Sequence, residues 1–349
     1  MTILVAKSPK RRRPIRLGDQ VERVAKYAVL IGAAVWLIAN LVKAPSQFFQ
    51  NIETGIGNGA LYALIALGYT LVYGIIELIN FAHGDLFMLG TVLAANMMVN
   101  WLHLTTPTVT AFLGLVLTMI VVMIFCALIN MGAEFFAYRR LRNAPKLAPL
   151  ITAVGLSFIF QNIGQLVNGS GQPLWDTIFT QSGFTIGGVK VLWSFIVVLI
   201  ATGLLLLGLT FVVQNTLQGK AMRATAQDQD AARLMGINVN RTISFTFGLG
   251  GAMAGAGAVL YLETVGHTRY DDGLTLGLFA FTAAVLGGIG NLLGAVLGAL
   301  LIGVIQALND GSPYAIGAQW SKALIFAILI LVLVFKPEGL LGQRTTEKV

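Results

Sequence analysis

Long apolar runs separated by short polar segments make up most of the chain. Apolar runs of about 18 or more residues exceed what a soluble core needs, and they indicate membrane-spanning helices. We place ten spans near residues 27–42, 54–76, 78–100, 108–130, 148–168, 190–213, 242–262, 274–288, 291–309 and 320–335. The pairs 54–76/78–100 and 274–288/291–309 are almost continuous, so each pair could instead be a broken or re-entrant helix hairpin. The pattern predicts an all-α polytopic membrane protein.

Basic residues gather on one side of the predicted membrane. If the N-terminus is cytoplasmic, the cytoplasmic segments 1–26, 131–149, 214–241 and 336–349 hold 19 of the 23 Lys and Arg residues. Cytoplasmic loops of membrane proteins are enriched in Lys and Arg, so this bias predicts that both termini are cytoplasmic. Ten spans also permit two halves of five with opposite orientation, an inverted repeat that many transporters share.

Four segments follow from this pattern. They are a basic cytoplasmic tail (1–26), an extra span with a linker (27–50), a transmembrane domain (51–336) with a polar cytoplasmic loop (214–241), and a C-terminal cytoplasmic tail (337–349). The first apolar run, preceded by basic residues, could also be a cleaved signal peptide. The basic region is long and no clean small-x-small cleavage site follows, which favours an uncleaved span.

Composition supports the membrane class and argues against several others. Hydrophobic residues make up 56% of the chain and charged residues only 11%, whereas soluble domains carry about 25% charged residues. The single cysteine, Cys126, excludes a disulfide framework within the chain, and the three histidines lack a metal-binding spacing. Much of the net charge of +8 lies in the N-terminal tail, which favours contact with membrane lipid over nucleic acid. No GxxxxGK[ST] phosphate loop is present in the sequence.

Polar side chains at membrane depth are the candidates for function, because ionisable groups in hydrocarbon usually face a bundle interior or a water-filled cavity. Gly84 interrupts a run of such groups where spans 54–76 and 78–100 meet, and a broken helix is tolerated only where it is buried or lines a cavity. The candidates for a substrate pathway are Asn58, Tyr62, Tyr69, Tyr73, Glu77, Asn80, His83, Asp85, Gln161 and Asn162. The three tyrosines are spaced to share one helix face.

Two alternatives to a pathway stay open for these residues. The run that ends at Asp85 could form a short cytoplasmic hairpin whose charges simply face water. Gln161 and Asn162 could form hydrogen bonds that only join neighbouring helices.

The polar loop within 214–241 has an unusual composition for a linker. It is rich in alanine and charged residues, and it is neither Gly/Ser-rich nor Pro-rich. Alanine favours a helix, Gly236 fits the C-terminus of that helix, and Asn238 fits the following turn. We therefore expect a stiff cytoplasmic helix over Gln218–Asn238 whose small side chains let a soluble partner approach closely. A helix resting on the lipid surface is the alternative, but the segment has no aromatic anchor.

Several stretches resemble the branched-chain amino-acid permease family of ABC importers, of the subunit type called LivH. These are "NGALYALIALGYTLVYGIIELINFAHGDLFMLG" (Asn58–Gly90), "AAVLGGIGNLLGAVLGALLIG" and the closing "KPEGLLG" (Lys336–Gly342). In addition, "DAARLMGI" (Asp230–Ile237) resembles the cytoplasmic EAA-type loop of ABC permeases, with Asp230 where Glu is usual. The resemblance covers roughly residues 50–342, and the first fifty residues depart from it.

The resemblance implies a permease subunit of the bacterial inner membrane that translocates branched-chain or other hydrophobic amino acids. A related LivM-type permease would complete the path, an external solute-binding protein would deliver the amino acid, and two separate ATPase subunits would bind ATP and Mg²⁺. The chain itself would hold no cofactor and would not be an enzyme. The loop residues implied to couple the chain to the ATPases are Arg223, Asp230, Ala231, Ala232, Gly236 and Ile237.

Two other functions stay open on the sequence. A urea or short-amide permease would share the NxAHG stretch and the EAA-like loop. An ion-coupled secondary transporter would need paired acidic residues in mid-span, but Glu77, Asp85 and Glu263 lie near the predicted span ends.

Overall fold

The computed structural model describes residues 31–342 except 79, 104–108, 143, 146, 172–177, 179–181 and 337. The predicted basic tail (1–26) therefore lies outside the described residues, as does most of the predicted C-terminal tail. The helices are Ile31–Lys43, α2 (Pro45–Ile76), α3 (Ala82–Ala95), the π-helical η1 (Asn96–Trp101), α4 (Val109–Ala133), the π-helical η2 (Glu134–Tyr138), α5 (Arg139–Leu141), α6 (Leu147–Asn168), α7 (Trp193–Asn215), α8 (Leu217–Gln227), α9 (Gln229–Leu234), α10 (Val239–Val265), α11 (Asp272–Gly287), α12 (Leu292–Gly311), the 3₁₀-helical η3 (Ala318–Trp320) and α13 (Ser321–Phe335).

An apolar helix stands at each of the ten predicted spans, which confirms the all-α polytopic class. Within the described residues, eight helices are long and apolar enough to cross a bilayer. The two shorter ones are Ile31–Lys43 and α11. The predicted inverted repeat stays a prediction.

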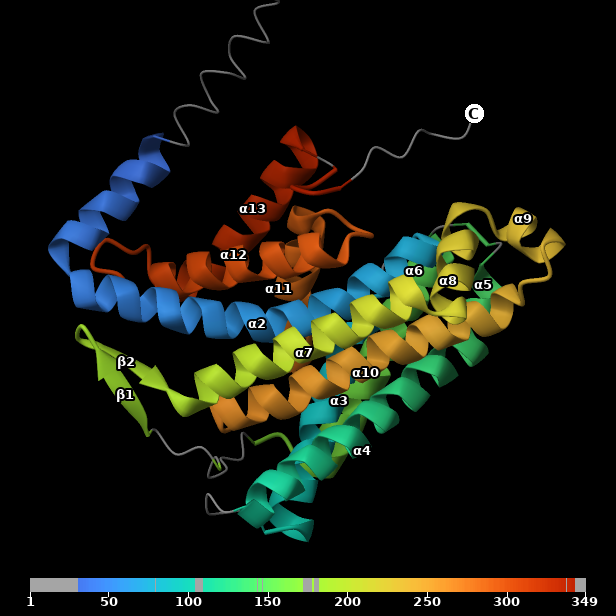
Figure 1. Ribbon diagram of the computed structural model, residues 1–349, viewed down its shortest axis with the longest axis horizontal. Coiled ribbons are helices and arrows are strands. Elements are labelled where there is room, and N and C mark those ends of the chain that lie inside the picture. The colour runs from blue at the N-terminus through green and yellow to red at the C-terminus, as the bar shows by residue number, and fades with distance from the viewer. Residues whose placement is uncertain are drawn as a thin grey trace, which may run out of the picture.

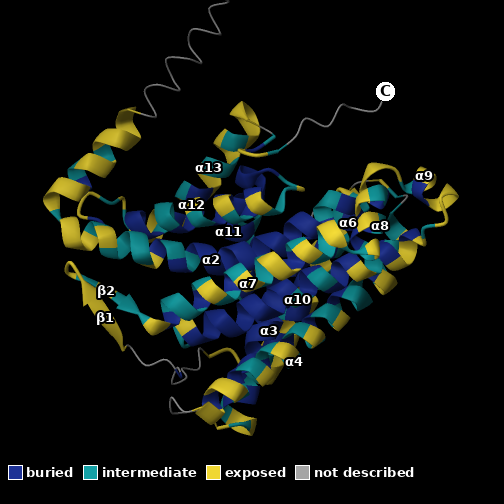
Figure 2. Cartoon of the chain, in the orientation of Figure 1, coloured by how far each residue is buried: buried dark blue, intermediate teal, exposed yellow. Residues whose placement is uncertain are grey.

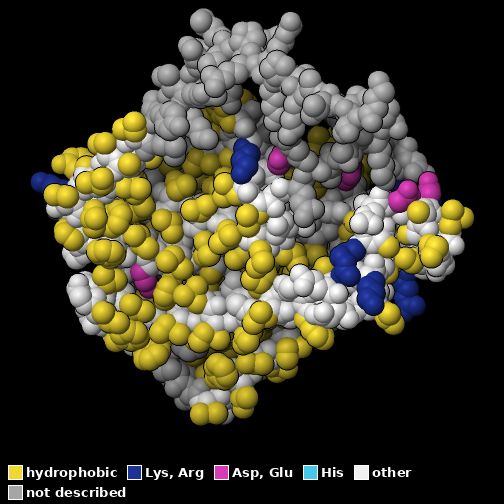
Figure 3. All heavy atoms as spheres, turned by 45° about the horizontal axis from the view of Figure 1, so that its top comes forward, with side chains coloured by type: hydrophobic (Ala, Val, Ile, Leu, Met, Phe, Trp, Pro, Cys, Tyr) yellow, Lys and Arg dark blue, Asp and Glu magenta, His cyan; other side chains and the backbone are white. Residues whose placement is uncertain are grey.

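The helices form an inner and an outer group. Helices α2, α3 and α10 are largely buried, whereas α6, α7 and α13 expose most of their apolar side chains (Figures 1 and 2). Exposed apolar faces of this kind suit contact with lipid tails. In Figure 3 most of the visible surface is hydrophobic, and the basic side chains in view concentrate at the end of the molecule that carries α8 and α9.

Small residues set the spacing of the inner helices. A Cβ built on Gly59 of α2 would lie 2.7 Å from the Cα of Leu300 in α12, so the two backbones touch there. Without a strong hydrophobic force between helices in lipid, close van der Waals packing of this kind is what holds them together. The pair α2 and α12 forms one wall of the bundle, and α10 packs between α2 and α4.

The predicted break between spans two and three is present. Helix α2 ends at Glu77, whose φ of 53° turns the chain back. His83 in the first turn of α3 then lies against Gly68, eight residues before the end of α2. At a rise of 1.5 Å per residue, α3 therefore begins about 12 Å inside the end of α2. Helix α11 also begins inside the bundle, where its Gly273 meets Gly84 of α3.

Three elements differ from the sequence prediction. Helix α2 begins at Pro45 rather than near residue 54, with the proline in its first turn, where a missing backbone N–H is tolerated. The fourth span does not end near residue 130, because α4, η2 and α5 form one continuous helix over Val109–Leu141. The segment before α7 contains a β-hairpin, β1 (Gly183–Ile186) paired antiparallel with β2 (Val189–Leu192), in place of the start of a helix at residue 190. Gln50 of α2 holds this hairpin by exchanging two hydrogen bonds with the backbone of Lys190, at 3.1 and 2.8 Å.

The end of the described chain is not a free tail. The backbone nitrogens of Leu340 and Leu341 donate to the carbonyls of Leu286 and Gly287, at 2.7 and 3.0 Å. The side chain of Asn291 donates to the Leu341 carbonyl at 2.9 Å. The closing residues therefore fold onto the turn between α11 and α12.

Candidate pathway and docking segment

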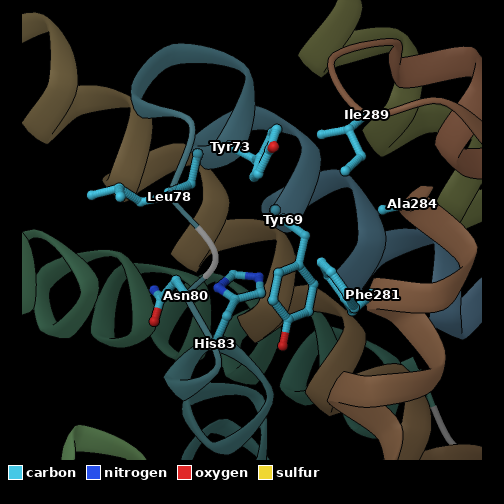
Figure 4. A pocket seen from close by; sticks show the side chains of 10 residues that line it. Tyr69, Tyr73, Leu78, Asn80, His83, Phe281, Ala284 and Ile289 are labelled. Carbon is cyan, nitrogen blue, oxygen red and sulfur yellow. The ribbon is translucent and has the colours of Figure 1, made fainter. Parts of the chain in front are cut away.

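A narrow pocket opens beside the break between α2 and α3. It is tight in this conformation, with room for about one water molecule between its walls. Its walls come from α2, the break, α3, α11 and the turn that follows α11 (Figure 4). The lining residues are Gly68, Tyr69, Val72, Tyr73, Leu78, Asn80, His83, Phe281, Ala284 and Ile289. Four of the ten predicted pathway residues, namely Tyr69, Tyr73, Asn80 and His83, thus share one pocket.

Aromatic rings form the floor of this pocket. Tyr69 stands between His83 and Phe281, with ring centroids 4.9 and 5.9 Å away (Figure 4). The imidazole of His83 is 1% exposed, and neither ring nitrogen has a hydrogen-bond partner of regular geometry in the described structure. The space for this ring exists because residue 68 is glycine, since a Cβ there would overlap the imidazole.

Asp85 belongs to a second polar cluster, between α3 and α6. Its carboxylate is fully buried and accepts hydrogen bonds from the Ser157 hydroxyl and, at 3.2 Å, from the Gln161 amide. Gln161 is half-buried, so the cluster reaches the outer surface of α6. The alternative in which the amide of Gln161 joins helices therefore has direct support. Sequence analysis missed Ser157, although its position four residues before Gln161 places it on the same helix face.

The remaining pathway candidates lie apart from these two clusters. Tyr62 is buried between α2 and α12, where its hydroxyl donates to Gln306 at 2.6 Å. Its ring packs on Phe279 of α11, so Tyr62 and Tyr69 do face the same neighbour. Glu77 is exposed at the end of α2, and Asn58 is half-buried in the other half of that helix. Asn162 is exposed on α6 and donates to the Phe158 carbonyl of its own helix.

The loop predicted as one helix over Gln218–Asn238 consists of two short helices, α8 and α9. The prediction of a single helix was wrong because Asp228 ends α8 in an extended conformation and caps α9. Its carboxylate accepts from the backbone nitrogens of Asp230 and Ala231, at 2.9 and 3.0 Å. Gly236 ends α9 with a φ of +82°, as expected of a helix C-terminus. Asn238 caps α10 by accepting from the backbone nitrogen of Arg241.

The exposed surface of α9 differs in part from the predicted contact set. Asp230, Ala231 and Gly236 are exposed, but Ala232 is 3% exposed and packs inward, and Ile237 is half-buried. Arg223 is held by the Val213 carbonyl at the end of α7.

Two exposed side chains beside these were missed. Leu234 and Met235 are 90% and 82% exposed. Helix α9 ends at Leu234, and both side chains lie exposed at its tip. We call α8, α9 and Met235–Ile237 the docking segment.

A buried carboxylate lies next to the docking segment. Glu134 of η2 is fully buried, and it pairs with Arg139 at 2.9 Å and with Arg142. The Ser244 hydroxyl of α10 donates to Glu134 at 2.5 Å, and Arg142 donates to Asn240 at 2.7 Å. Burial lowers the pKa of the Arg142 guanidinium, although arginine keeps its charge in proteins. The cluster ties the end of the long helix Val109–Leu141 to the first turns of α10.

The chain forms an α-helical bundle with interrupted inner helices, buried polar clusters and outer faces suited to lipid. These are the features of a polytopic membrane protein of the transport class. The match to known proteins makes the class specific. Residues 51–333 match the family described as branched-chain amino acid transport system / permease component. The chain belongs to this family, and it is a transporter permease rather than an enzyme.

Characterised relatives cover almost the whole chain. It is 38% identical to the high-affinity branched-chain amino acid transport system permease protein BraD of Pseudomonas aeruginosa, over 87% of this chain and 98% of BraD. It is 37% identical to LivH of Escherichia coli K12, over 86% of this chain and 98% of LivH. Among solved structures, PsaBC from Streptococcus pneumoniae in complex with Fab aligns with a TM-score of 0.40 at 15% identity, covering 86% of this chain and 96% of that chain.

Proposed function

We propose that the chain is a membrane subunit of an ATP-driven importer that moves branched-chain or other hydrophobic amino acids inward. The observation that carries this proposal is the family match over residues 51–333, together with 38% identity to BraD, whose name states this transport activity. The aromatic and aliphatic lining of the pocket at Tyr69, Phe281 and Ile289 has the apolar character that such a side chain needs, and the pocket would have to widen to admit it.

The family match supports the proposed partners. Permease components act in transport systems with several subunits, and here ATP and Mg²⁺ would bind to two separate ATPase subunits. These would dock on the docking segment, whose tip presents Leu234 and Met235 to solvent. A second permease subunit of the LivM type would complete the passage, and an external solute-binding protein would deliver the amino acid.

The charge distribution supports an orientation with both termini in the cytoplasm of a bacterial cell, in the inner membrane. Two segments predicted to be cytoplasmic on charge alone, 131–149 and 214–241, lie side by side. Arg142 of the first donates a hydrogen bond to Asn240 of the second. The basic residues predicted to be outside are only Lys43, Lys190, Arg269 and Lys322. A cytoplasmic surplus of Lys and Arg of this kind is what the positive-inside rule describes.

Reconstitution tests the proposed function. The chain is purified with the proteins that accompany it, placed in proteoliposomes, and supplied with radiolabelled L-leucine and the copurifying binding protein. We expect uptake that requires ATP inside the vesicle and that excess L-isoleucine or L-valine suppresses. Uptake that persists without ATP and stops on addition of an ionophore would instead indicate an ion-coupled carrier. ATP-dependent uptake of urea but not of L-leucine would indicate a short-amide permease.

A further inference from the structure

The π-helical segment η2 contacts two functional regions at once. Its buried side chains, Glu134 and Tyr138, are four residues apart and project from one side of the helix. Glu134 faces α10 at Ser244, as described above. The hydroxyl of Tyr138 donates to the Oδ1 of Asn80, at 2.7 Å, in the break between α2 and α3. Asn80 is one of the residues that line the pocket.

The contact with α10 continues directly from the docking segment. Backbone bonds close the end of α9, where the Ile237 nitrogen donates to the Ala232 carbonyl at 3.0 Å. Asn238 then starts α10, and α8 and α9 both pack against α10, so a displacement of the docking segment pushes on the first turns of α10. Those turns carry Ser244, which bonds Glu134, and Phe247, whose ring lies 5.7 Å from that of Tyr138. A continuous set of bonded and packed side chains therefore joins the docking segment, α10, η2 and the break.

The ion pairs of Glu134 and the burial of Tyr138 resist movement of η2 relative to its neighbours. Separating Glu134 from Arg139 and Arg142 costs much free energy, because it leaves a buried charge unpaired. Tyr138 is 1% exposed, and its hydroxyl would lose its bond to Asn80 if η2 moved alone. The break that receives the bond lies between the end of α2 at Glu77 and the start of α3 at Ala82, where hinge residues that join rigid elements are commonly found. π-helical turns inserted in longer helices are frequent at functional positions.

We propose that η2 is a connector that passes movement of the docking segment to the break between α2 and α3, and so to the pocket. Tyr138 and Glu134 act as positioning residues in it, and they do not contact the transported molecule. The proposal rests on the proposed function for its biological purpose. Its physical content, a coupling between two parts of this chain, can be tested without knowing the substrate.

The test uses the assembled complex of the chain with its copurifying ATPase subunits. Hydrogen exchange is measured with and without a non-hydrolysable ATP analogue, in the wild type and in Tyr138→Phe. The variant keeps the ring that packs on Phe247 and removes only the hydroxyl that bonds Asn80. In the wild type we expect the analogue to change exchange both in the docking segment and around Asn80. In Tyr138→Phe we expect the change to remain in the docking segment and to be lost around Asn80.

Two further variants make the result decisive. Tyr314→Phe removes only a phenolic hydroxyl, from an exposed residue in the loop after α12, and should behave as wild type. Ser244→Ala removes one of the hydrogen bonds that link the Glu134 cluster to α10 and leaves the Arg142–Asn240 bond, so it should weaken the change around Asn80 without abolishing it, even if Tyr138→Phe assembles poorly. A wild-type complex with no change around Asn80, or a Tyr138→Phe complex that responds like the wild type, would overturn the connector.

A transport measurement separates this inference from the proposed function. In proteoliposomes that take up L-leucine, Tyr138→Phe should lower the number of leucine molecules moved per ATP hydrolysed, because it removes the hydrogen bond that links η2 to the break. ATP hydrolysis itself should continue. If the wild type moves no L-leucine but the exchange pattern is as expected, the proposed substrate is wrong and the connector stands.

Discussion

The side-chain amide of Gln161 in α6 donates to the Oδ1 of Asp85 in α3 across 3.2 Å inside the bundle. The two residues are 76 positions apart, and α6 is otherwise an outer helix with many exposed apolar side chains. One carboxylate thus fastens an outer helix to the first turn of an interrupted inner helix. Removing this carboxylate should therefore loosen the contact between the two helices.

Asp85→Ala should destabilise the chain. It leaves the Ser157 hydroxyl and the Gln161 amide without their shared acceptor, and a buried polar group that loses its partner costs about 1–3 kcal/mol. The midpoint of thermal unfolding in detergent should fall accordingly. Asn162→Ala on the same helix is the matched control, because its amide bonds only its own helix at the surface. Equal midpoints for Asp85→Ala and Asn162→Ala would contradict the structural role of the carboxylate.

Gly68→Ala should also destabilise the chain, because the new methyl group would overlap the imidazole of His83 and lie 2.9 Å from the Gly250 carbonyl. Overpacking of this kind costs about 1–3 kcal/mol. Gly208→Ala in α7 is the control, since no atom lies within 4 Å of the added Cβ. There the better helix former should leave stability unchanged or raise it by up to about 1 kcal/mol. The midpoint of thermal unfolding is measured for both variants. If Gly68→Ala is as stable as Gly208→Ala, the imidazole of His83 does not pack against residue 68.

Met235→Asp should abolish binding of the ATPase subunits and leave the fold intact. The side chain is 82% exposed at the tip of the docking segment, so a charge there meets water in the free chain and an apolar surface in the complex. Copurification of the ATPases with the tagged chain measures the effect, and the unfolding temperature checks the fold. Ile316→Asp, at a 61% exposed position in the loop after α12, is the control and should retain the ATPases. Full copurification with Met235→Asp would rule out the tip as the contact.

Asp228→Ala should loosen α9 without affecting the membrane helices. It removes an acceptor for two backbone nitrogens at the start of the helix, and loss of such a cap costs about 0.5–2 kcal/mol. Hydrogen exchange should rise in residues 229–235 and stay constant in α10. Asp228→Ser keeps an acceptor oxygen at this position and should restore much of the protection. Unchanged exchange in Asp228→Ala would show that the cap is not needed.

Much of the helix arrangement was accessible from the sequence, because membrane helices leave a strong local signal. The apolar runs predicted the ten apolar helices, and the polar groups at membrane depth pointed to Tyr69, Asn80 and His83, which the structure brings into one pocket. The break after Glu77 was also expected, since Gly84 and several polar groups interrupt the apolar pattern. These features depend on residues close together in the chain.

The missed features depend on contacts that periodicity does not encode. Ser157 became notable only as a partner of Asp85, and Tyr138 only because Asn80 lies opposite its hydroxyl. The β-hairpin is a different case, because its signal was present. Gly187 and Gly188 stand between two alternating segments, which is typical of a two-residue hairpin turn. The apolar run that continues into α7 concealed it.

The backbone hydrogen bonds that Leu340 and Leu341 donate to Leu286 and Gly287 have a consequence for how the protein is made. The turn between α11 and α12 receives its last hydrogen bonds from residues that the ribosome adds after every helix of the bundle. During synthesis the carbonyls of Leu286 and Gly287 therefore lack these hydrogen-bond donors until the residues after the final span have been made. A chain truncated before Leu340 would carry all its helices and still lack the closure that fastens the last of them to the rest.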